Sequence, residues 1–320
     1  MNSNKLEIRK FDQSDYPEIV RLNNLVFPER KRDEESLRYN DKNKAEKCEH
    51  QRYIAEIDAK VVGHGYYTQL EWSYSPGKFF INGCIHTDFQ ERGYGSEFYR
   101  FLMDELGEKD PKKLEGHTRE DKKRGIQFLE DRGFKETQRE WELVLNVDDF
   151  DFEEFRGLEE RLERDHSIRL KSVDEIRFDE EAKKKLHELF KEIANDVPRP
   201  GEHTDVDFDQ FISFFERPDF LPKGYIIAVK DDEFIGFTSH LKRGEDEALY
   251  TCLTGVKREY RGDGIATALK IKAIEVAADE GFSKMTTENE TDNEAMLHIN
   301  QKLGFEKKPA WISYEKVLQK

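Results

Sequence analysis

The chain has 320 residues, of which 53 are Lys or Arg and 69 are Asp or Glu, so its formal net charge is −16. This length favours two domains, and the acidic excess argues against binding to nucleic acid, because phosphate binding depends on basic side chains. The 23 Phe and 12 Tyr residues supply the bulky apolar groups that a folded core needs.

The first half alternates predicted strands and helices. Apolar or alternating runs predict strands, and apolar residues at i, i+3 and i+4 spacing predict helices packed on one side. In chain order these are a strand at 6–11, helices at 15–27 and 34–46, strands at 53–57, 61–70 and 78–86, and a helix at 93–106. We expect one more strand, a helix and a terminal pair of strands to follow.

The same order recurs after Asp165. It comprises a strand at 168–173, a helix at 180–194, strands at 225–230, 233–242 and 248–256, and a helix at 262–280. Two landmarks share one spacing, since the glycine turns give 264 − 93 = 171 and the later Gly-Phe pairs give 304 − 133 = 171. This agreement predicts a duplicated α/β (α+β) domain. We expect domains at 1–147 and 166–320, joined at 148–165 by an acidic, solvated linker with some apolar anchoring.

Each half has a glycine-containing turn between a strand and a helix. The first reads Gln90-Glu91-Arg92-Gly93-Tyr94-Gly95, and the second reads Arg261-Gly262-Asp263-Gly264-Ile265-Ala266. Backbone N–H groups in such a turn, at the start of a helix, can bind a pyrophosphate. A dinucleotide fingerprint needs a further glycine where Phe98 and Thr267 stand, and a P-loop needs Gly-Lys-Ser/Thr. Both of these phosphate sites are therefore excluded.

The two turns resemble the acyl-CoA turn of the GNAT superfamily of N-acetyltransferases, which reads Gln/Arg-x-x-Gly-x-Gly/Ala after the fourth strand. The later Arg132-Gly133-Phe134 and Leu303-Gly304-Phe305 resemble the end of the family's fourth helix, so the likeness covers both halves. The resemblance implies two tandem domains, each with a mixed, mostly antiparallel sheet flanked by helices. Each sheet would splay between its fourth and fifth strands and hold the pantetheine arm in the gap. The arrangement is similar to that of mycothiol synthases.

The resemblance also implies that acetyl-CoA is the acyl donor and that backbone N–H groups bind much of it. The implied contacts are Val256, Arg261, Gly262, Asp263, Gly264, Ile265, Ala266 and Asn293 in the second half, and Ile85, Gln90, Arg92, Gly93, Tyr94 and Gly95 in the first. Asn293 could also simply cap the following helix. Glu91 stands where a glycine is usual and would bring a carboxylate toward the pyrophosphate. We therefore expect the first copy to be degenerate, serving a structural role or holding cofactor without turnover.

The catalytic groups are expected in the second half. Acetyl transfer needs a deprotonated amine, an oxyanion stabiliser and often an acid for the departing thiolate. The family's usual Tyr acid is replaced by Asn300 in the second half and by Leu129 in the first. We expect the amide of Asn300 to stabilise the thiolate by donating a hydrogen bond.

The fourth strand of the second half offers polar candidates for the base. Counting back by twos from Val256 gives Thr254, Cys252 and Tyr250, whereas counting back from Ile85 gives Gly83, Ile81 and Phe79. We therefore predict catalytic roles for Tyr250 and Thr254. A bulge would change which residues share a face, and Tyr250 and Cys252 could instead simply pack in the sheet.

The acceptor is expected to be the amine of a small molecule. Asn289 is one predicted contact, and a longer segment in the second half adds Glu202 and His203, whose acidic neighbourhood would favour a cationic amine. The predicted function is acetyl-CoA-dependent N-acetylation by the second half. Two alternatives are an acyl-CoA-binding sensor without turnover and a protein-modifying acetyltransferase.

The three cysteines, Cys48, Cys84 and Cys252, are odd in number and lack CxxC spacing, so neither a disulfide framework nor a zinc site is predicted. The N-terminus lacks an apolar signal-peptide core, and no run of about 18 apolar residues occurs. We expect a cytoplasmic protein without metal, nucleic-acid or membrane partners. The sequence does not define an oligomeric state.

Overall fold

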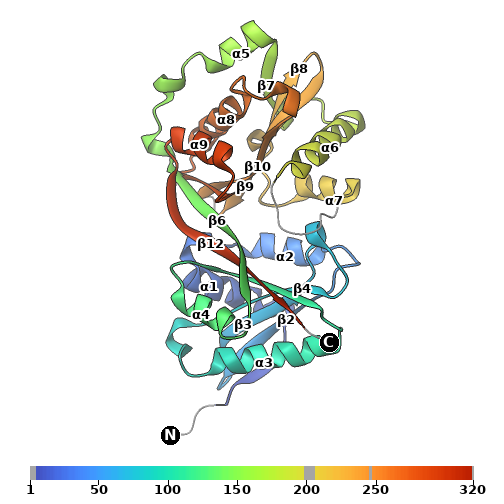
Figure 1. Cartoon of the computed structure of the whole chain (residues 1–320), viewed down its shortest axis with the longest axis vertical. Helices are drawn as coiled ribbons and strands as arrows, with labels where there is room; N and C mark the ends of the chain where they lie inside the picture. Colours follow the sequence, from blue (N-terminus) through green and yellow to red (C-terminus); the bar gives the residue numbers. More distant parts are fainter. Residues whose placement is uncertain (1–4, 198–205, 245–246, 319–320) are drawn as a thin grey trace. The chain divides into compact units, whose positions relative to one another are not determined.

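A computed structural model describes residues 5–197, 206–244 and 247–318. The chain divides into two compact units, and neither is a single continuous stretch of sequence (Figure 1). Unit 1 is built mainly from residues 1–138 and 311–320, whereas unit 2 is built from 139–200 and 205–310. This division differs from the expected boundaries at 147 and 166, because the last strand of each half belongs largely to the other unit.

The sheet of unit 1 has the strand order β1-β2-β3-β4-β5-β12. The β4–β5 pair is parallel, and the other neighbours are antiparallel. Its strands are β1 (Glu7–Lys10), β2 (His50–Ile57), β3 (Lys60–Thr68), β4 (Lys78–Ile85), β5 (Lys113–Arg119) and the end of β12 (Glu306–Val317). Its helices are α1 (Tyr16–Val26), α2 (Glu34–Lys42), α3 (Tyr94–Gly107) and α4 (Lys123–Glu130).

The sheet of unit 2 has the order β6-β11-β10-β9-β8-β7, again with one parallel pair, β10–β11. Its strands are β6 (Lys135–Asn146), β7 (Ile168–Ser172), β8 (Ile226–Lys230), β9 (Glu233–Arg243), β10 (Ala248–Val256) and β11 (Lys284–Glu290). Its helices are α5 (Leu158–His166), α6 (Glu180–Asn195), α7 (Phe208–Ser213), α8 (Ile265–Asp279) and α9 (Glu294–Lys302). The predicted mixed, mostly antiparallel sheets are confirmed.

Helices cover both faces of the unit 2 sheet (Figure 1). On the α8 face, the buried side of α8 packs against Leu249 and Val256 of β10. On the α6 face, α6 packs against Ile227 of β8 and Phe237 of β9. The α6 helix begins at the cap Asp179, whose side chain accepts from two backbone N–H groups, and its core stripe is Ala182, Leu186, Leu189 and Ile193.

The repeat predicted from the sequence is confirmed element by element. The helix that follows each glycine turn begins at Tyr94 in unit 1 and at Ile265 in unit 2, a spacing of 265 − 94 = 171. Gly133 and Gly304, which lie at the same spacing, have φ values of +79° and +82°. These left-handed positions end α4 and α9 without the steric cost that a Cβ would add.

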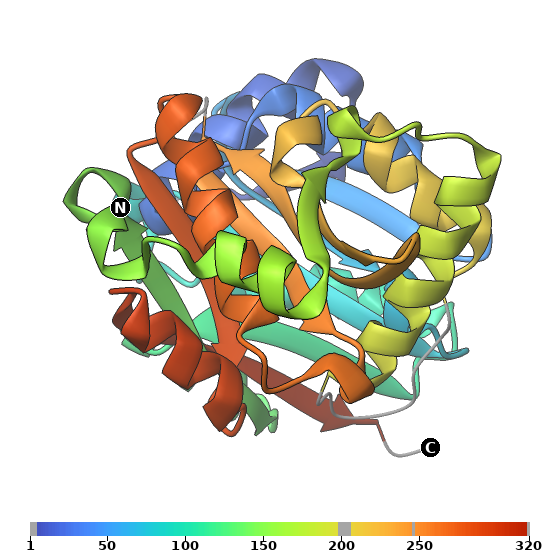
Figure 2. The same ribbon diagram turned by 90° about the horizontal axis from the view of Figure 1, so that it is seen from above.

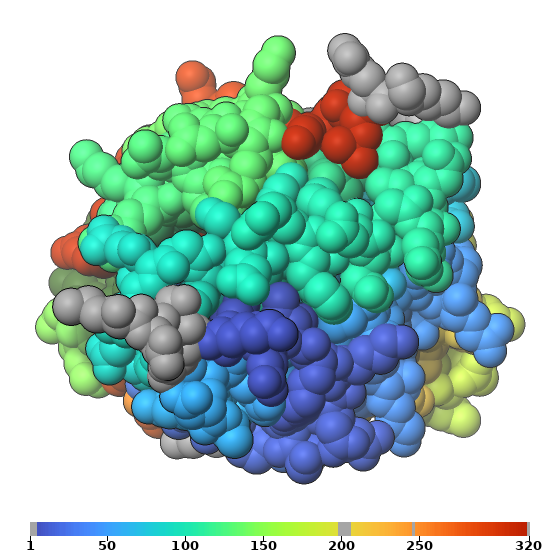
Figure 3. Space-filling model, turned by 90° about the horizontal axis from the view of Figure 1, so that it is seen from below, coloured from blue at the N-terminus to red at the C-terminus, as the bar shows by residue number. Residues whose placement is uncertain are grey.

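The two halves exchange their last strands. Strand β6 of the first half pairs with β11 and buries Leu143 and Leu145 in the core of unit 2. The end of β12 pairs with β5 and buries Ile312 and Tyr314 in the core of unit 1. Figure 3 shows the red C-terminal residues against turquoise and green residues of the first half.

The expected terminal strand pair of the first half was wrong. Residues 135–146 form the single strand β6. No Gly or Pro interrupts this stretch, so the chain has no turn signal at which it could reverse.

The segment expected as an acidic linker with some apolar anchoring is folded and packs on unit 2. It contains α5, whose Leu162 is 2% exposed and belongs to the core beneath α8. The rings of Phe150 and Phe155 stack at 5.5 Å and pack on the same core. Figure 2 shows α5 beside α8. The apolar residues within the acidic run therefore pack on the core of unit 2 despite the charged residues around them. Among the described residues, no helix is long and apolar enough to cross a membrane.

We predict that the exchanged strand stabilises unit 1. Tyr314→Ala removes a side chain that is 1% exposed and should cost about 3–5 kcal/mol of unfolding free energy, as for other buried aromatic residues. Urea denaturation followed by circular dichroism measures this cost. Val317→Ala is the control, because Val317 lies on the same strand and is 66% exposed. Equal stability of the two variants would contradict the assignment of β12 to the core of unit 1.

Candidate functional site

Each sheet opens between its fourth strand and the strand that follows in the chain. In unit 1, β4 and β5 pair only from Lys78–Phe80 to Lys113–Glu115. In unit 2, β10 and β11 pair only from Ala248–Tyr250 to Lys284–Thr286. Beyond these pairs the facing backbone groups have no partner across the opening, so a ligand can meet them. The predicted splay is confirmed in both copies.

The glycine turn of unit 2 forms the start of α8. Gly262 and Gly264 have φ values of +97° and +82°, which a side chain would strain. The guanidinium of Arg261 donates to the carbonyl of Val256 at 2.8 Å, which ties the turn to the end of β10. The first N–H groups of α8 point out of the helix with no intrahelical acceptor. The turn therefore provides a cradle of donors at the positive end of a helix dipole.

Other predicted cofactor residues surround this cradle. Ile265, the first residue of α8, is buried, and Ala266 is half-buried. The carboxylate of Asp263 lies 3.6 Å from the His166 imidazole. Asn293 caps α9, accepting from the N–H of Met296 at 3.3 Å. The capping role considered from the sequence is thus present, and it leaves the amide N–H₂ of Asn293 available to a ligand.

The turn of unit 1 has the same backbone path but a different chemistry. The side chain of Gln90 donates to the carbonyl of Ile85 at 2.8 Å, as Arg261 does to Val256. Glu91 takes the left-handed φ of +62° where unit 2 has Gly262. Its carboxylate pairs with Arg124 at 2.6 Å, and both side chains are about two-thirds exposed. The first copy therefore places an acidic side chain on the turn that would receive phosphate.

The remaining predicted residues of the first turn have ordinary structural roles. Gly93 has a φ of +87° and begins α3, and Tyr94 is buried in the core of unit 1. Arg92 lies over the Phe89 ring at 5.5 Å. Gly95 is half-buried, and a Cβ there would meet Phe128 at 3.6 Å.

Asp196, at the C-terminal end of α6, was predicted as part of the acidic segment that walls the acceptor pocket, but its pairing with the glycine turn was not predicted. Its carboxylate accepts from Arg258 and Arg261, which flank the glycine turn of unit 2. The hydrogen bonds from Arg258 and Arg261 lower the pKa of Asp196 to about 2, and the one from Arg258 has the larger effect. Asp196 lies 65 residues before Arg261 in the sequence, so no local pattern could have paired them. The ion cluster connects the end of α6 to the turn.

A β-bulge in β10 separates two residues that were predicted to share a face. The register of β10 against β9 shifts between Thr251 and Leu253. Leu249 and Val256 both belong to the α8 face although they are seven positions apart, whereas Leu253 packs on the α6 face. Tyr250 therefore lies on the α6 face and Thr254 on the α8 face. The expected row of Tyr250, Cys252 and Thr254 was wrong for this reason.

In unit 1, counting back by twos along β4 from Ile85 gave the correct face for Ile81 and Phe79. No register shift interrupts the pairing of β4 with β3. Phe79 and Ile81 accordingly lie together in the core, in the apolar row that ends at Ile85.

Tyr250 stands in a cluster of ionisable groups on the α6 face. Its hydroxyl donates to Glu288 of β11 at 3.4 Å, and the Arg243 guanidinium carbon lies 3.3 Å from the centroid of its ring. Arg243 also approaches Glu288 at 3.8 Å. The sequence did not single out Glu288. The cluster lies where β10 and β11 separate, so it faces the opening between them.

Glu288 belongs to a row of carboxylates on that face. In the β6–β11 register, Glu142 stands opposite Glu288 and Glu140 stands opposite Glu290. Glu142 is 7% exposed and Glu290 is 8% exposed. Two of these residues come from the first half, so only the strand exchange brings the row together.

Three other predicted site residues lie on the α8 side of the sheet and form side-chain hydrogen bonds there: Thr254, Asn289 and Asn300. The hydroxyls of Thr254 and Thr238 lie 2.7 Å apart. Asn300 is fully buried on α9 and donates its side-chain N–H to the Asn289 carbonyl oxygen. Asn289 therefore lies on the opposite face from Tyr250 and Glu288. Glu202 and His203 lie outside the described residues. Burial raises the pKa of the Cys252 thiol to about 12, which disfavours a thiolate nucleophile there.

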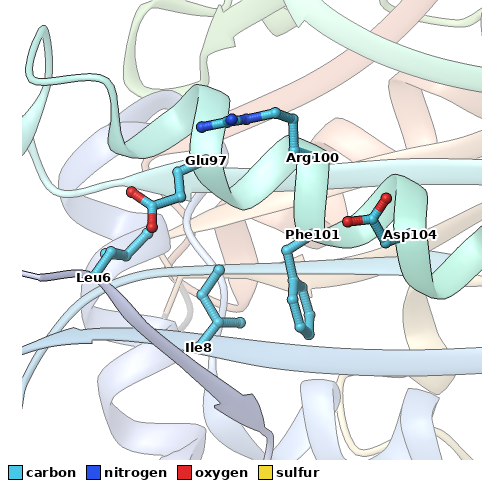
Figure 4. Close-up of a pocket in the computed structure, with 6 residues that line it drawn as sticks. All are labelled: Leu6, Ile8, Glu97, Arg100, Phe101 and Asp104. Carbon is cyan, nitrogen blue, oxygen red and sulfur yellow. The ribbon is translucent and has the colours of Figure 1, made fainter.

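One surface depression lies in unit 1, with a volume of about 430 Å³ (Figure 4). Leu6 and Ile8 line it from the region of β1, and Glu97, Arg100, Phe101 and Asp104 line it from α3. None of these six residues belongs to a glycine turn, to β4 or to β10.

Matches to the acetyltransferase (GNAT) family model cover residues 16–134 and 184–305, so each match contains one opening and one turn. The chain belongs to the GNAT acetyltransferase family and contains two tandem copies of its domain. The expectation drawn from the turns is confirmed at this level.

Relatives agree with this assignment. A stretch of 87 residues is 33% identical to N-alpha-acetyltransferase 30 of Schizosaccharomyces pombe and covers 26% of this chain and 58% of that protein. A stretch of 91 residues is 33% identical to mycothiol acetyltransferase of Paenarthrobacter aurescens and covers 27% of this chain and 28% of that protein. In both cases the match spans less than two thirds of the relative.

Solved structures extend the likeness to the whole fold. A tandem GNAT protein from the clavulanic acid biosynthesis pathway has a TM-score of 0.75 at 17% identity, over 98% of each chain. A GCN5-related N-acetyltransferase from Sphaerobacter thermophilus has a TM-score of 0.71 at 14% identity, over 98% of this chain and 96% of that one. At these identities the similarity establishes the fold.

We predict that Gly264→Asp removes CoA binding from unit 2, because it places a side chain and a negative charge in the donor cradle. Gly281→Asp is a matched control, since Gly281 lies beyond the other end of α8 and has a φ of +80°, close to the +82° of Gly264. Isothermal titration with CoA measures both variants. Unchanged CoA affinity in folded Gly264→Asp protein would contradict the site.

We predict that Glu91→Gly improves CoA binding by unit 1. The change removes a carboxylate from the turn and relieves a left-handed conformation that costs a non-glycine residue about 1–2 kcal/mol. The titration is made in the Gly264→Asp background, so that any CoA bound is held by unit 1. If the double variant binds no better than Gly264→Asp alone, Glu91 is not what weakens the first copy.

Proposed function

We propose that this protein transfers an acetyl group from acetyl-CoA to the amine of a small molecule and that the chemistry takes place in unit 2. One observation carries the proposal. Unit 2 combines an opening between strands, a turn with glycine at both left-handed positions, and a cluster of ionisable groups beside the opening. In unit 1 the same opening lies next to a turn that carries Glu91 and to an apolar β4 row.

The donor's pyrophosphate would bind the N–H groups of Gly262 to Ala266, where the dipole of α8 favours an anion. The backbone of β10 near Val256 would hold the pantetheine arm, and the amide of Asn293 would add a donor. This binding relies on main-chain groups, so the glycine positions matter more than any single side chain. Acetyl-CoA supplies the activated acetyl group when it is bound.

Glu288 is the proposed base. An amine must lose a proton to attack a thioester, and a carboxylate held at the opening can accept it. The hydroxyl of Tyr250 donates to Glu288 and so fixes the carboxylate, while Arg243 stacks on the Tyr250 ring and limits its movement. Thr254 lies on the other face of β10 and would act toward the acetyl donor, acetyl-CoA.

The charge around the base favours a cationic acceptor. Glu140, Glu142 and Glu290 lie on the same face as Glu288, and their field attracts an ammonium group and raises its local concentration. Glu202 and His203 remain proposed acceptor contacts, with Asn289 a further one. The similarity to mycothiol acetyltransferases supports a small-molecule acceptor without identifying it.

We predict that Tyr250→Phe and Glu288→Gln each reduce turnover about 10²-fold, the scale of a lost acid–base group, while CoA affinity stays near that of the wild type. The assay follows CoA thiol release with a panel of small amines and a peptide bearing a free amino terminus. Tyr260→Phe is the control. The Tyr260 hydroxyl donates to Glu233 at 3.0 Å, and this pair lies away from the opening.

Three results would decide against this account. Turnover that survives Tyr250→Phe but is lost in Gly93→Asp would place the chemistry in unit 1. CoA binding without thiol release for any amine would favour the sensor. Turnover with the peptide alone would favour a protein-modifying enzyme.

A further inference from the structure

Lys270 is a buried cation that neither the fold nor the proposed base explains. It lies on α8, is 3% exposed, and has the fully buried Leu269 and Ile274 as neighbours on the helix. Its ammonium nitrogen lies 5.5 Å from the centroid of the Phe305 ring. Among the described residues it has no hydrogen-bond or ion-pair partner. An unpaired buried charge is costly, so its presence in the core calls for a reason.

Three side-chain polar atoms on the same side of the sheet are fully buried without a hydrogen-bond partner among the described residues. They are Nε2 of His240, Oγ1 of Thr251 and Oδ1 of Asn300. Thr251 and His240 are opposite each other in the β9–β10 register. Asn300 lies on α9, where its backbone carbonyl accepts from Phe305 at 3.0 Å. Elements α8, α9, β9 and β10 thus each carry a buried polar side chain on the α8 side of the sheet.

His240 is neutral and fixed in one orientation. Its Nδ1 lies 2.6 Å from the carbonyl of Gly224, so Nδ1 carries the proton and Nε2 is an acceptor. Burial, with a smaller contribution from the nearby Lys270 cation, lowers the pKa of His240 to about 3. His240 is therefore an acceptor at neutral pH and does not compete with Lys270 as a cation.

Among the described residues, the other elements packed on α8 add no charge that shifts the pKa of Lys270. On this side they present Ile226 and Ala228 from β8, Leu249 and Thr251 from β10, Met285, Thr287 and Asn289 from β11, and Asn300 from α9. Glu159 of α5 pairs with Lys272 on the outer side of α8. Burial alone lowers the pKa of Lys270, to about 8.

The repeat provides an internal comparison. At the spacing of 171, Lys270 corresponds to Tyr99 and Asn300 corresponds to Leu129. The Tyr99 hydroxyl is also buried without a partner among the described residues, and its ring packs on Phe128 at 5.8 Å. Both units therefore hold a proton donor at this position of the helix, but unit 2 alone of the two combines it with the Tyr250–Glu288 cluster.

We propose that Lys270 is the acid that protonates the CoA thiolate as it leaves, in place of the tyrosine that Asn300 replaces. The inference rests on the proposed function of unit 2. An ammonium acceptor first loses one proton through Glu288 to water. The neutral amine nitrogen then forms a bond to the acetyl carbon, the carbon–sulfur bond breaks, and the electron pair leaves on sulfur. Lys270 gives its proton to that sulfur, and Glu288 takes the proton that the amine nitrogen loses.

The proton balance closes over one turnover. After product release the protonated Glu288 returns its proton to water, and the neutral Lys270 takes one from water. A buried lysine suits this step, because its proton affinity approaches that of a thiol with a pKa near 8.5. Burial also favours the neutral lysine that remains after the transfer. Asn300 keeps a supporting role through its hydrogen bond to Asn289.

The direct test is Lys270→Met, which preserves volume and removes the charge. Lys272→Met is the control, because Lys272 lies on the exposed side of α8 and pairs with Glu159 and Glu275. The first readout is the pH titration of the thiol of bound CoA, followed by thiolate absorbance. In the wild type and in Lys272→Met the Lys270 cation should lower the thiol pKa, and in Lys270→Met it should not.

The second readout separates an acid from a structural residue. With acetyl-CoA, Lys270→Met should lose roughly 10²- to 10⁴-fold in kcat, as for other general acids. With an acetyl thioester of an aryl thiol, which leaves without protonation, most of that loss should disappear. In this turnover assay Lys270→Arg should lose activity as Lys270→Met does, because guanidinium keeps its proton.

Each outcome bears on the proposal. An equal loss for both thioesters, or bound CoA thiols with the same pKa in wild type and Lys270→Met, would overturn the role of Lys270 and leave the proposed function standing. A wild-type protein that binds no CoA would overturn the proposed function and this inference together.

Discussion

The parallel ladder between β10 and β11 ends after three residue pairs, and the rest of the site depends on that ending. A strand inside a sheet has its N–H and C=O groups satisfied by its neighbours. Where β10 and β11 separate, those groups face an opening instead. The end of β10 then leads straight into the Gly262–Gly264 turn and the start of α8, so donors from strand and helix line one continuous path.

The exchange of final strands gives this opening its surroundings. Unit 2 receives β6 from the first half, and β6 brings Glu140 and Glu142 beside Glu290 and Glu288. Without the exchange, the face that carries Tyr250 would lack half of its carboxylates. The same exchange completes unit 1 with the end of β12, so each half of the chain depends on the other for its own core. The first half of the chain is therefore needed for the core of unit 2.

The sequence predicted what local patterns determine. The glycines of the two turns, the amphipathic helices and the spacing of 171 residues are local or repeated signals, and the structure places α3 and α8 accordingly. The bulge in β10 could not be read from Thr251-Cys252-Leu253, because a register shift depends on the partner strand. It moved Tyr250 and Thr254 to opposite faces. The role of Glu288 and the pairing of Asp196 with Arg261 were missed because their partners are distant in sequence.

Hydrogen exchange with and without CoA measures directly whether acetyl-CoA binds in the opening of unit 2. CoA should slow exchange at the backbone N–H groups of residues 252–256 and 262–267. Residues 85–95 of unit 1 should change much less. Protection confined to residues 85–95, or no protection at saturating CoA, would contradict the account.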